Sequence, residues 1–146
     1  MFFLIVLNNK DPIDYVQRQL LGSGRAVHPL LRRVMQIHVT EEARHLCFAR
    51  AYLRVRVPQL RPVRRQIMAM LAPLVLGATA REMLDPPTVI VRTYQIPRTV
   101  VERDYRNSPI QRERLRTSLS KVRALCEQLD LVTPAARRIW RATGIA

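Results

Sequence analysis

Three residues of metal-binding type lie on one narrow stripe of a predicted helix, which limits the possible folds more than any other feature. His38, Glu42 and His45 follow one another at spacings of four and three residues. At 100° per residue they fall at about 0°, 40° and −20° around a helix, so their side chains point in one direction. The same stripe carries Leu31 and Ala49, which predicts burial. Because a buried charge requires a partner, we expect these three groups to surround a cation.

The spacing of apolar residues predicts an all-α chain. Apolar residues recur every three or four positions through a helix that starts at Pro29 and ends before Pro58. Pro12 either opens the preceding helix or kinks a longer one that runs from Met1. Residues 88–109 are expected to be extended, with strand-like residues at 88–94 and a short helix around 100–105. The other predicted helices cover residues 13–21, 63–84 with a kink at Pro73, 110–129 and 134–140, the last with Thr133 as its cap.

The chain of 146 residues predicts one domain, 1–146, with the ligand helix at about 29–57. Its formal net charge is +14, and only two of its 25 basic residues are lysines. The arginines are spread from Arg18 to Arg141 and are not accompanied by a stacking pattern of aromatic residues, so the charge does not favour nucleic-acid binding. An arginine-rich helical module that binds nucleic acid or acidic partners is the alternative function.

Cysteine usage and hydropathy predict a cytoplasmic protein that does not enter a membrane. Cys47 and Cys126 lie far apart, and no secretory signal precedes them, so a disulfide framework is not expected. We expect Cys47 to be packed in the core. The apolar residues 1–7 are too few to span a bilayer, and Arg65 and Arg81 flank the apolar residues 67–80.

The pair Glu42 and His45 has the Glu-x-x-His spacing that ferritin-like di-iron and di-manganese proteins use on two of their helices. Neutral imidazole and carboxylate groups suit iron(II) or manganese(II). Two other interpretations of these residues remain open. The helix could carry an ordinary solvated face with Glu41 and Arg44, or a zinc site, although in zinc proteases the glutamate directly follows the first histidine.

Residues 34–53 resemble the fourth ligand helix of the p-aminobenzoate N-oxygenase type of di-iron oxygenase, whose motif stands here at residues 38–45 as His-x-x-Glu-Glu-x-Arg-His. In that family the helix supplies a Glu-x-x-His pair and an extra histidine one turn earlier, which correspond here to Glu42, His45 and His38. The resemblance implies a ferritin-like helical bundle, a non-haem di-iron centre with manganese as the alternative metal, and oxygen-dependent oxidation of a small-molecule amine.

The third helix of the family supplies a glutamate from about thirty residues upstream. The corresponding candidate is Asp11, which lies 31 positions before Glu42, and Asp14 is the alternative. Asp11 followed by Pro12 is equally well interpreted as a helix N-cap with proline at the first helical position. Glu41 and Arg44 are candidates for hydrogen bonds to the metal ligands on the side that faces away from the metal.

Tyr52 is expected in the core or at the edge of the same pocket.

The resemblance covers the chain as the C-terminal half of such an enzyme, and the first two ligand helices of the family have no counterpart in this sequence. One hypothesis is therefore a truncated oxygenase with uncovered apolar faces and little or no activity alone. The other is a homodimer in which each chain provides Asp11, His38, Glu42 and His45.

Overall fold

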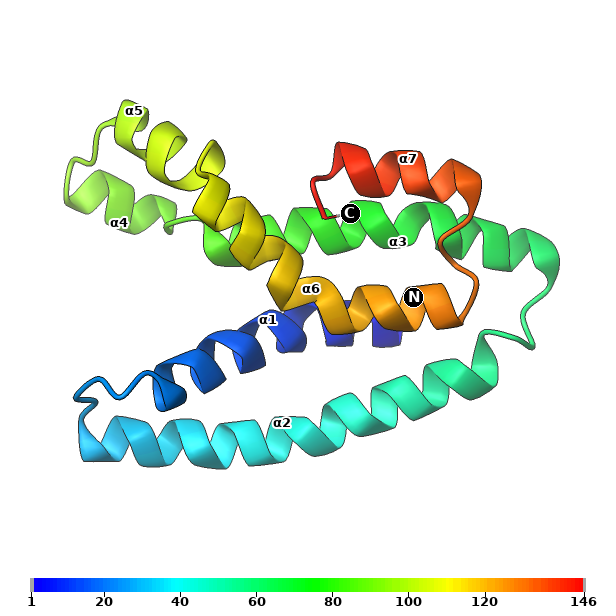
Figure 1. Ribbon diagram of the computed structural model, residues 1–146, viewed down its shortest axis with the longest axis horizontal. Helices are drawn as coiled ribbons and strands as arrows, with labels where there is room; N and C mark the ends of the chain where they lie inside the picture. Colours follow the sequence, from blue (N-terminus) through cyan, green and yellow to red (C-terminus); the bar gives the residue numbers. More distant parts are fainter. Residues whose placement is uncertain (1, 146) are drawn as a thin grey trace.

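The computed structural model describes residues 2–145, apart from the side chains of residues 8, 83 and 84, and shows a bundle of helices (Figure 1). These residues contain no β-strand, so the all-α prediction is confirmed. The helices are α1 Phe2–Gly22, α2 Pro29–Arg56, α3 Pro62–Leu84, α4 Thr88–Thr93, α5 Arg98–Val101, the π-helix η1 Glu102–Arg106, α6 Pro109–Gln128 and α7 Pro134–Ala142.

Helices α1 and α2 form an antiparallel hairpin (Figure 1). Pro12 lies inside α1 and is buried, so the longer of the two predicted helices is the one that forms. The interpretation of Asp11 as a helix N-cap is therefore wrong, because α1 begins nine residues earlier, at Phe2. Pro29 opens α2, and the imidazole Nδ1 of His28 caps it by accepting the N–H of Leu30 at 3.3 Å.

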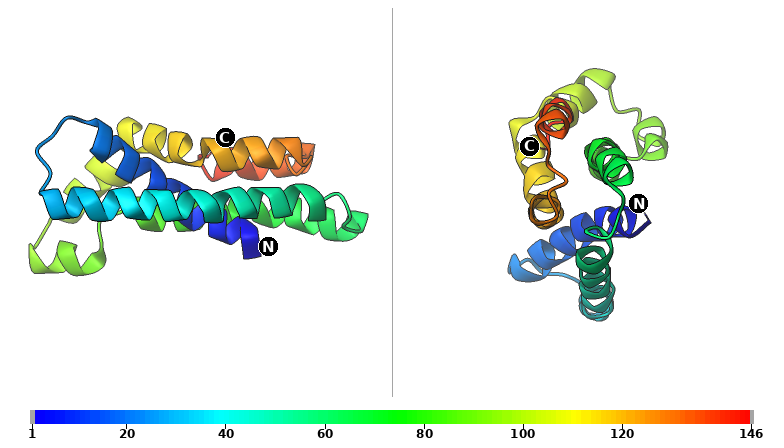
Figure 2. Two further views of the ribbon diagram at one scale, coloured as in Figure 1. Left: turned by 90° about the horizontal axis from the view of Figure 1, so that it is seen from below. Right: turned by 90° about the vertical axis from the view of Figure 1, so that its right-hand side faces the viewer.

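The core lies where α1 meets α3 and α6. Figure 2 shows α1 between α2 on one side and α3 and α6 on the other, and α7 packs along α3. Residues from all of these helices are buried in one cluster, which includes Leu7, Leu46, Leu76, Leu119 and Trp140. Because α2 packs mainly against α1, most of the circumference of α2 remains open.

Two local predictions are wrong. Residues 88–93 form the helix α4 rather than an extended segment. Their β-branched side chains favour a strand only when neighbouring strands pack against them, and none of the described residues provides one. Cys47 is exposed rather than packed, because it lies about 140° from Glu42 around α2 and so points away from the buried face.

The remaining predictions of helices are confirmed. Helix α3 continues through Pro73, α6 and α7 match their predicted ranges, and the short helix expected near residue 100 is α5 with η1. The Thr133 hydroxyl caps α7 by accepting the N–H of Ala136 at 3.3 Å. Among the described residues, none of the helices has the length and apolar character needed to cross a membrane.

Candidate metal centre

The candidate site is centred on Glu42, which lies on the buried face of α2 together with Met35, Leu46, Ala49 and Leu53. Only 8% of its side chain is exposed. Lys10, on the facing helix α1, donates from Nζ to Glu42 Oε1 at 2.5 Å. A buried carboxylate thus receives a cation from across the hairpin, as the cost of burying a lone charge requires.

Both predicted histidines approach the carboxylate of Glu42. His38 Nε2 lies 3.6 Å from Oε1, and His45 Nδ1 lies 3.6 Å from Oε2. The three groups therefore converge as the spacing predicts. They differ in burial, because 43% of the His38 side chain and 60% of the His45 side chain are exposed. The site lies at the edge of the interior, with His45 on its open side.

The orientation of His38 is set from α1. Its Nδ1 lies 2.9 Å from the amide oxygen of Gln17. Because an amide oxygen only accepts, Nδ1 carries the proton of the neutral ring and leaves the lone pair on Nε2, which faces Glu42. Metal-binding histidines are commonly held by such a hydrogen bond from the other ring nitrogen.

Asp11 is buried on α1 at the same level of the hairpin as Glu42. The contacts Phe3 with Tyr52, Lys10 with Glu42, and Gln17 with His38 give the register of the two antiparallel helices. In this register, Asp11 lies opposite residues 41–44. Its Oδ1 accepts from Nη2 of Arg50 at 2.5 Å.

Asp14, the alternative candidate, is also buried but is held by other groups. Arg18 donates from Nε to its Oδ2 at 2.8 Å, and Nζ of Lys121 on α6 lies 3.9 Å from the same oxygen. These contacts direct Asp14 toward α6 and not toward α2. Of the two aspartates, Asp11 is thus the one placed beside the ligand helix.

One carboxylate oxygen on each helix is buried without a hydrogen-bond partner among the described residues. These atoms are Asp11 Oδ2 and Glu42 Oε2. An orphaned buried acceptor costs about 1–3 kcal/mol, more when it is charged, so both oxygens favour an additional cation or proton donor.

Burial and the neighbouring cations act on these carboxyl groups in opposite directions. Burial is the largest influence on Asp11 and raises its pKa despite the attraction of Arg50. For Glu42, burial again raises the pKa, but the hydrogen bond and charge of Lys10, together with the two imidazoles, outweigh it and lower the pKa below its ordinary value. Glu42 is therefore ionised at neutral pH and available to a cation.

The other predicted neighbours lie away from this cluster. Glu41 and Arg44 are exposed and approach each other at 3.9 Å. Tyr52 packs against Phe3, with ring centroids 4.4 Å apart, and is 39% exposed, so it borders the open side rather than the core.

Sequence reasoning missed Lys10 and Arg50, the two cations that pair with the carboxylates. Lys10 carried a usable signal, because it is the only basic residue before Arg18.

The donor set suits a divalent metal in its chemistry but supplies only part of a site. Imidazole nitrogens and carboxylate oxygens are ligands that iron(II) and manganese(II) accept, and the two orphaned oxygens are available. However, the described residues contain no group of three or more His, Cys, Asp or Glu arranged to hold a metal ion by themselves. We conclude that the residues fit one part of a metal centre, not a complete one.

Comparison with known proteins identifies the family. Residues 1–130 match the family described as P-aminobenzoate N-oxygenase AurF. The chain belongs to this family. Membership in the AurF family and the all-α architecture together indicate a ferritin-like helical bundle. This agrees with the motif that places His38, Glu42 and His45 on one helix.

The chain is also similar to three uncharacterized mycobacterial proteins. It is 38% identical over 144 residues to the uncharacterized protein MT0908 of Mycobacterium tuberculosis strain CDC 1551. It is 37% identical to Mb0909 of Mycobacterium bovis and to Rv0885 of M. tuberculosis strain H37Rv. Each match covers 99% of this chain but only 42% of the relative. No solved structure matches.

Proposed function

We propose that this chain provides one half of a non-haem di-iron site that oxidises the nitrogen of a small-molecule amine with molecular oxygen. The observation that carries the proposal is the buried carboxylate of Glu42, with an orphaned Oε2 and an imidazole nitrogen 3.6 Å from each of its oxygens. His38, Glu42 and His45 would hold one metal ion, and Asp11 would contribute from α1. Manganese is the alternative metal.

The residues of this chain would prepare the centre rather than perform the oxidation. When the His38 ring is neutral, its hydrogen bond from Nδ1 to Gln17 leaves the lone pair on Nε2, and Glu42 supplies negative charge in a sheltered position. The bound iron would supply the oxygen chemistry: one oxygen atom enters the amine as a hydroxylamine and the other leaves as water, with electrons from an external reductant.

The open side of α2 is where the missing ligands would enter. Around the axis of α2, the sector between about 60° and 140° from Glu42 on the side of His45 exposes apolar residues. We call this surface the open flank. It consists of Val34, Ile37, Phe48, Tyr52 and Val55, which are each at least 39% exposed. Exposed apolar surface of this extent favours association. We propose that a second copy of the chain covers the open flank and supplies the other ligands.

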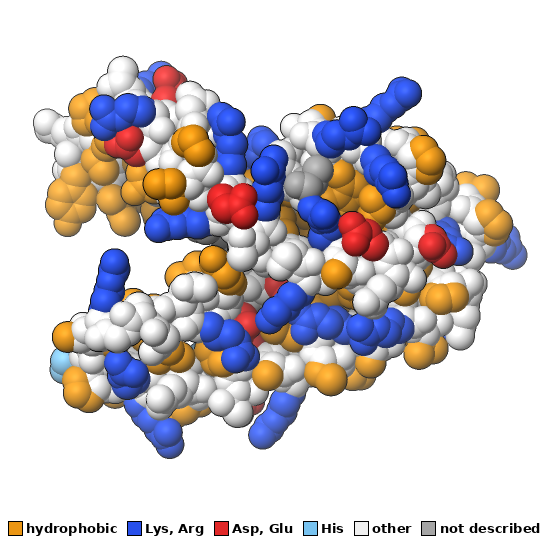
Figure 3. Space-filling model, viewed as in Figure 1, with side chains coloured by type: hydrophobic (Ala, Val, Ile, Leu, Met, Phe, Trp, Pro, Cys, Tyr) orange, Lys and Arg blue, Asp and Glu red, His pale blue; other side chains and the backbone are white. Residues whose placement is uncertain are grey.

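The alternative function, nucleic-acid binding, receives no specific support. On the face shown in Figure 3, the Lys and Arg side chains are scattered over all the helices in view and do not form one basic patch. Charge of this kind gives general attraction to phosphates without a defined interface.

The decisive experiment is metal analysis of the purified chain after anaerobic loading with iron(II), combined with size-exclusion chromatography. We expect a dimer that holds about one iron per chain. The double variant with His38→Ala and His45→Ala should lose the iron. His28→Asn is the matched control, because His28 is the remaining histidine, caps α2 outside the site, and Asn preserves the cap.

Activity is tested on the loaded protein with p-aminobenzoate, oxygen and a reductant, with the hydroxylamine product measured by mass spectrometry. A folded chain that retains no iron, or one that retains it equally in the double histidine variant, would overturn the proposal.

A further inference from the structure

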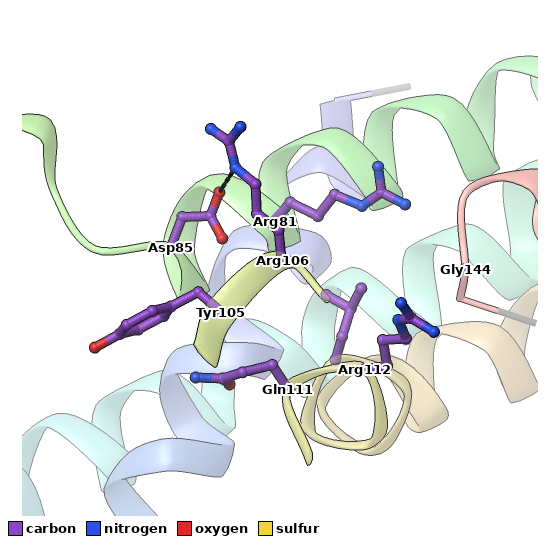
Figure 4. A pocket seen from close by; sticks show the side chains of 8 residues that line it. Arg81, Asp85, Tyr105, Arg106, Gln111, Arg112 and Gly144 are labelled. Carbon is purple, nitrogen blue, oxygen red and sulfur yellow. Dashed lines mark ion pairs between the residues drawn. The ribbon is translucent and has the colours of Figure 1, made fainter. Parts of the chain in front are cut away.

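A cavity of about 590 Å³ lies away from the α1–α2 hairpin (Figure 4). Its described lining comes from the end of α3, from η1, from the first two turns of α6 and from the turn after α7, and none of these described residues belongs to α1 or α2. Its size is within the range of small-molecule sites, roughly 300–1,000 Å³. The question is which kind of molecule its side chains would accept.

The lining carries an excess of positive charge. Three guanidinium groups, those of Arg81, Arg106 and Arg112, come from three different elements, whereas Asp85 is the only carboxylate among the lining residues that the structure describes. Figure 4 shows Arg106 directed toward Asp85, and the pair is long, with Nε 3.8 Å from Oδ2. The cavity therefore favours an anion.

The donors of these arginines are only partly used. Arg81 donates from Nη2 to the carbonyl oxygen of Thr143 at 2.6 Å, which fixes this side chain beside the last turn. The side chain of Arg112 has no hydrogen bond or ion pair with any residue that the structure describes. Arginine offers a planar set of donors that matches a carboxylate or phosphate in pairs, so Arg112 is available for such a contact.

The start of α6 adds to the attraction. Its N-cap, Ser108, makes no side-chain cap bond, and Pro109, Gln111 and Arg112 follow within the first turn. The positive end of a helix with uncapped amide groups favours a negative charge nearby. The anion would thus meet a helix terminus and arginine side chains at the same place.

Part of the lining is apolar. The buried side chain of Leu115 and the half-buried ring of Tyr105 belong to it. A free inorganic ion would leave this part of the cavity unused. We propose that the cavity binds a small organic anion, with a carboxylate or phosphate group at the arginines and an apolar body against Tyr105 and Leu115.

The test is isothermal titration calorimetry of the whole chain in the presence of a chelator, so that metal content has no influence on the result. Phenyl phosphate and benzoate are the two amphipathic probes, and they distinguish a phosphate ligand from a carboxylate ligand. Inorganic phosphate has the anionic group without an apolar body, and phenol has the apolar body without the anionic group. We expect saturable binding of one amphipathic probe, at least about tenfold tighter than either reference compound.

Variants then place the binding in the cavity. Arg112→Gln and Arg106→Gln should each weaken binding about tenfold or more. Arg138→Gln, on the exposed side of α7 and outside the cavity, should leave it unchanged. Circular dichroism establishes that each variant is folded. The proposal is wrong if no probe binds saturably, or if Arg138→Gln weakens binding as much as the two cavity variants do.

Discussion

The ion pair between Lys10 and Glu42 gives the most direct test of the hairpin. Lys10→Met preserves the length of the side chain and its apolar contacts but removes the ammonium group that Glu42 Oε1 accepts from at 2.5 Å. Glu42 would then be buried with both oxygens unpaired, because Oε2 already has no hydrogen-bond partner among the described residues. The variant should therefore be less stable.

The expected magnitude follows from the burial of the two partners. Removal of one member of a fully buried pair costs about 3–5 kcal/mol, whereas exposed pairs contribute about 0–1 kcal/mol. The Lys10 side chain is 33% exposed and that of Glu42 is 8% exposed, so the loss should fall between these limits. Glu42 can also reduce the cost by binding a proton. We expect a loss of about 2 kcal/mol in the free energy of unfolding.

The measurement is urea unfolding at neutral pH with a chelator present, followed by the fluorescence of the single tryptophan, Trp140, which is buried in the core. Lys121→Met is the control, because its ammonium group lies 3.9 Å from Asp14 and is well exposed. It should change stability by no more than about 0.5 kcal/mol. Glu42→Gln, combined with Lys10→Met, should recover part of the loss by removing the unpaired charge.

The reasoning is refuted if Lys10→Met costs no more than Lys121→Met. In that case, Glu42 would not depend on Lys10 in solution, and the burial of its carboxylate would need another explanation. If the double variant were less stable than Lys10→Met alone, the loss would come from packing and not from the unpaired charge.

Further predictions concern metal binding, helix packing and the two cysteines. Lys10→Met should bind manganese(II) more tightly than the unaltered chain in titration calorimetry, because Lys10 occupies an oxygen that the metal needs. Gly77→Ala should lower the melting temperature although alanine favours helices, because its Cβ would lie 2.8 Å from Cβ of Thr143. Combining it with Thr143→Gly, which removes this contact, should recover part of the lost stability. Iodoacetamide should modify the exposed Cys47 near pH 8 and leave the buried Cys126 unmodified until the chain unfolds. Burial raises the pKa of the Cys126 thiol from 9.0 to about 12. Between pH 9 and pH 12 the thiol therefore ionises more readily in the unfolded chain, and the free energy of unfolding should fall as the pH rises through this range. This fall should be smaller in Cys126→Ala.

Most of the helices could be predicted from the sequence because apolar spacing and proline positions are local signals. The convergence of His38, Glu42 and His45 was predictable for the same reason, since all three lie on one helix and their directions depend only on its period. Helix α4 was not predictable in this way. Its β-branched residues carry a strand preference that applies only beside other strands.

The pairing of the carboxylates could not be deduced from local signals. Asp11 meets Arg50, and Glu42 meets Lys10, at sequence separations of 39 and 32 residues. These contacts depend on the register of α1 against α2 and on the reach of long side chains. The position of Asp11 also depends on whether α1 continues through Pro12. In the structure it does, and Pro12 is buried inside the longer helix.

The balance of charge within the hairpin indicates what a complete metal centre would need. At the candidate site, α1 contributes Asp11 and Lys10, and α2 contributes Glu42 and Arg50, so each of these two carboxylates already has a cationic partner. Ferritin-like di-iron centres balance their two metal ions with four carboxylates, one from each helix of the bundle. One chain offers these two buried carboxylates in its hairpin, and a second copy would add the same two. A dimer across the open flank therefore supplies the expected number of carboxylates. For the carboxylates to bind metal ions, the metal ions must displace the cationic side chains of Lys10 and Arg50. Because Lys10→Met removes one of these competing cations, it should strengthen metal binding.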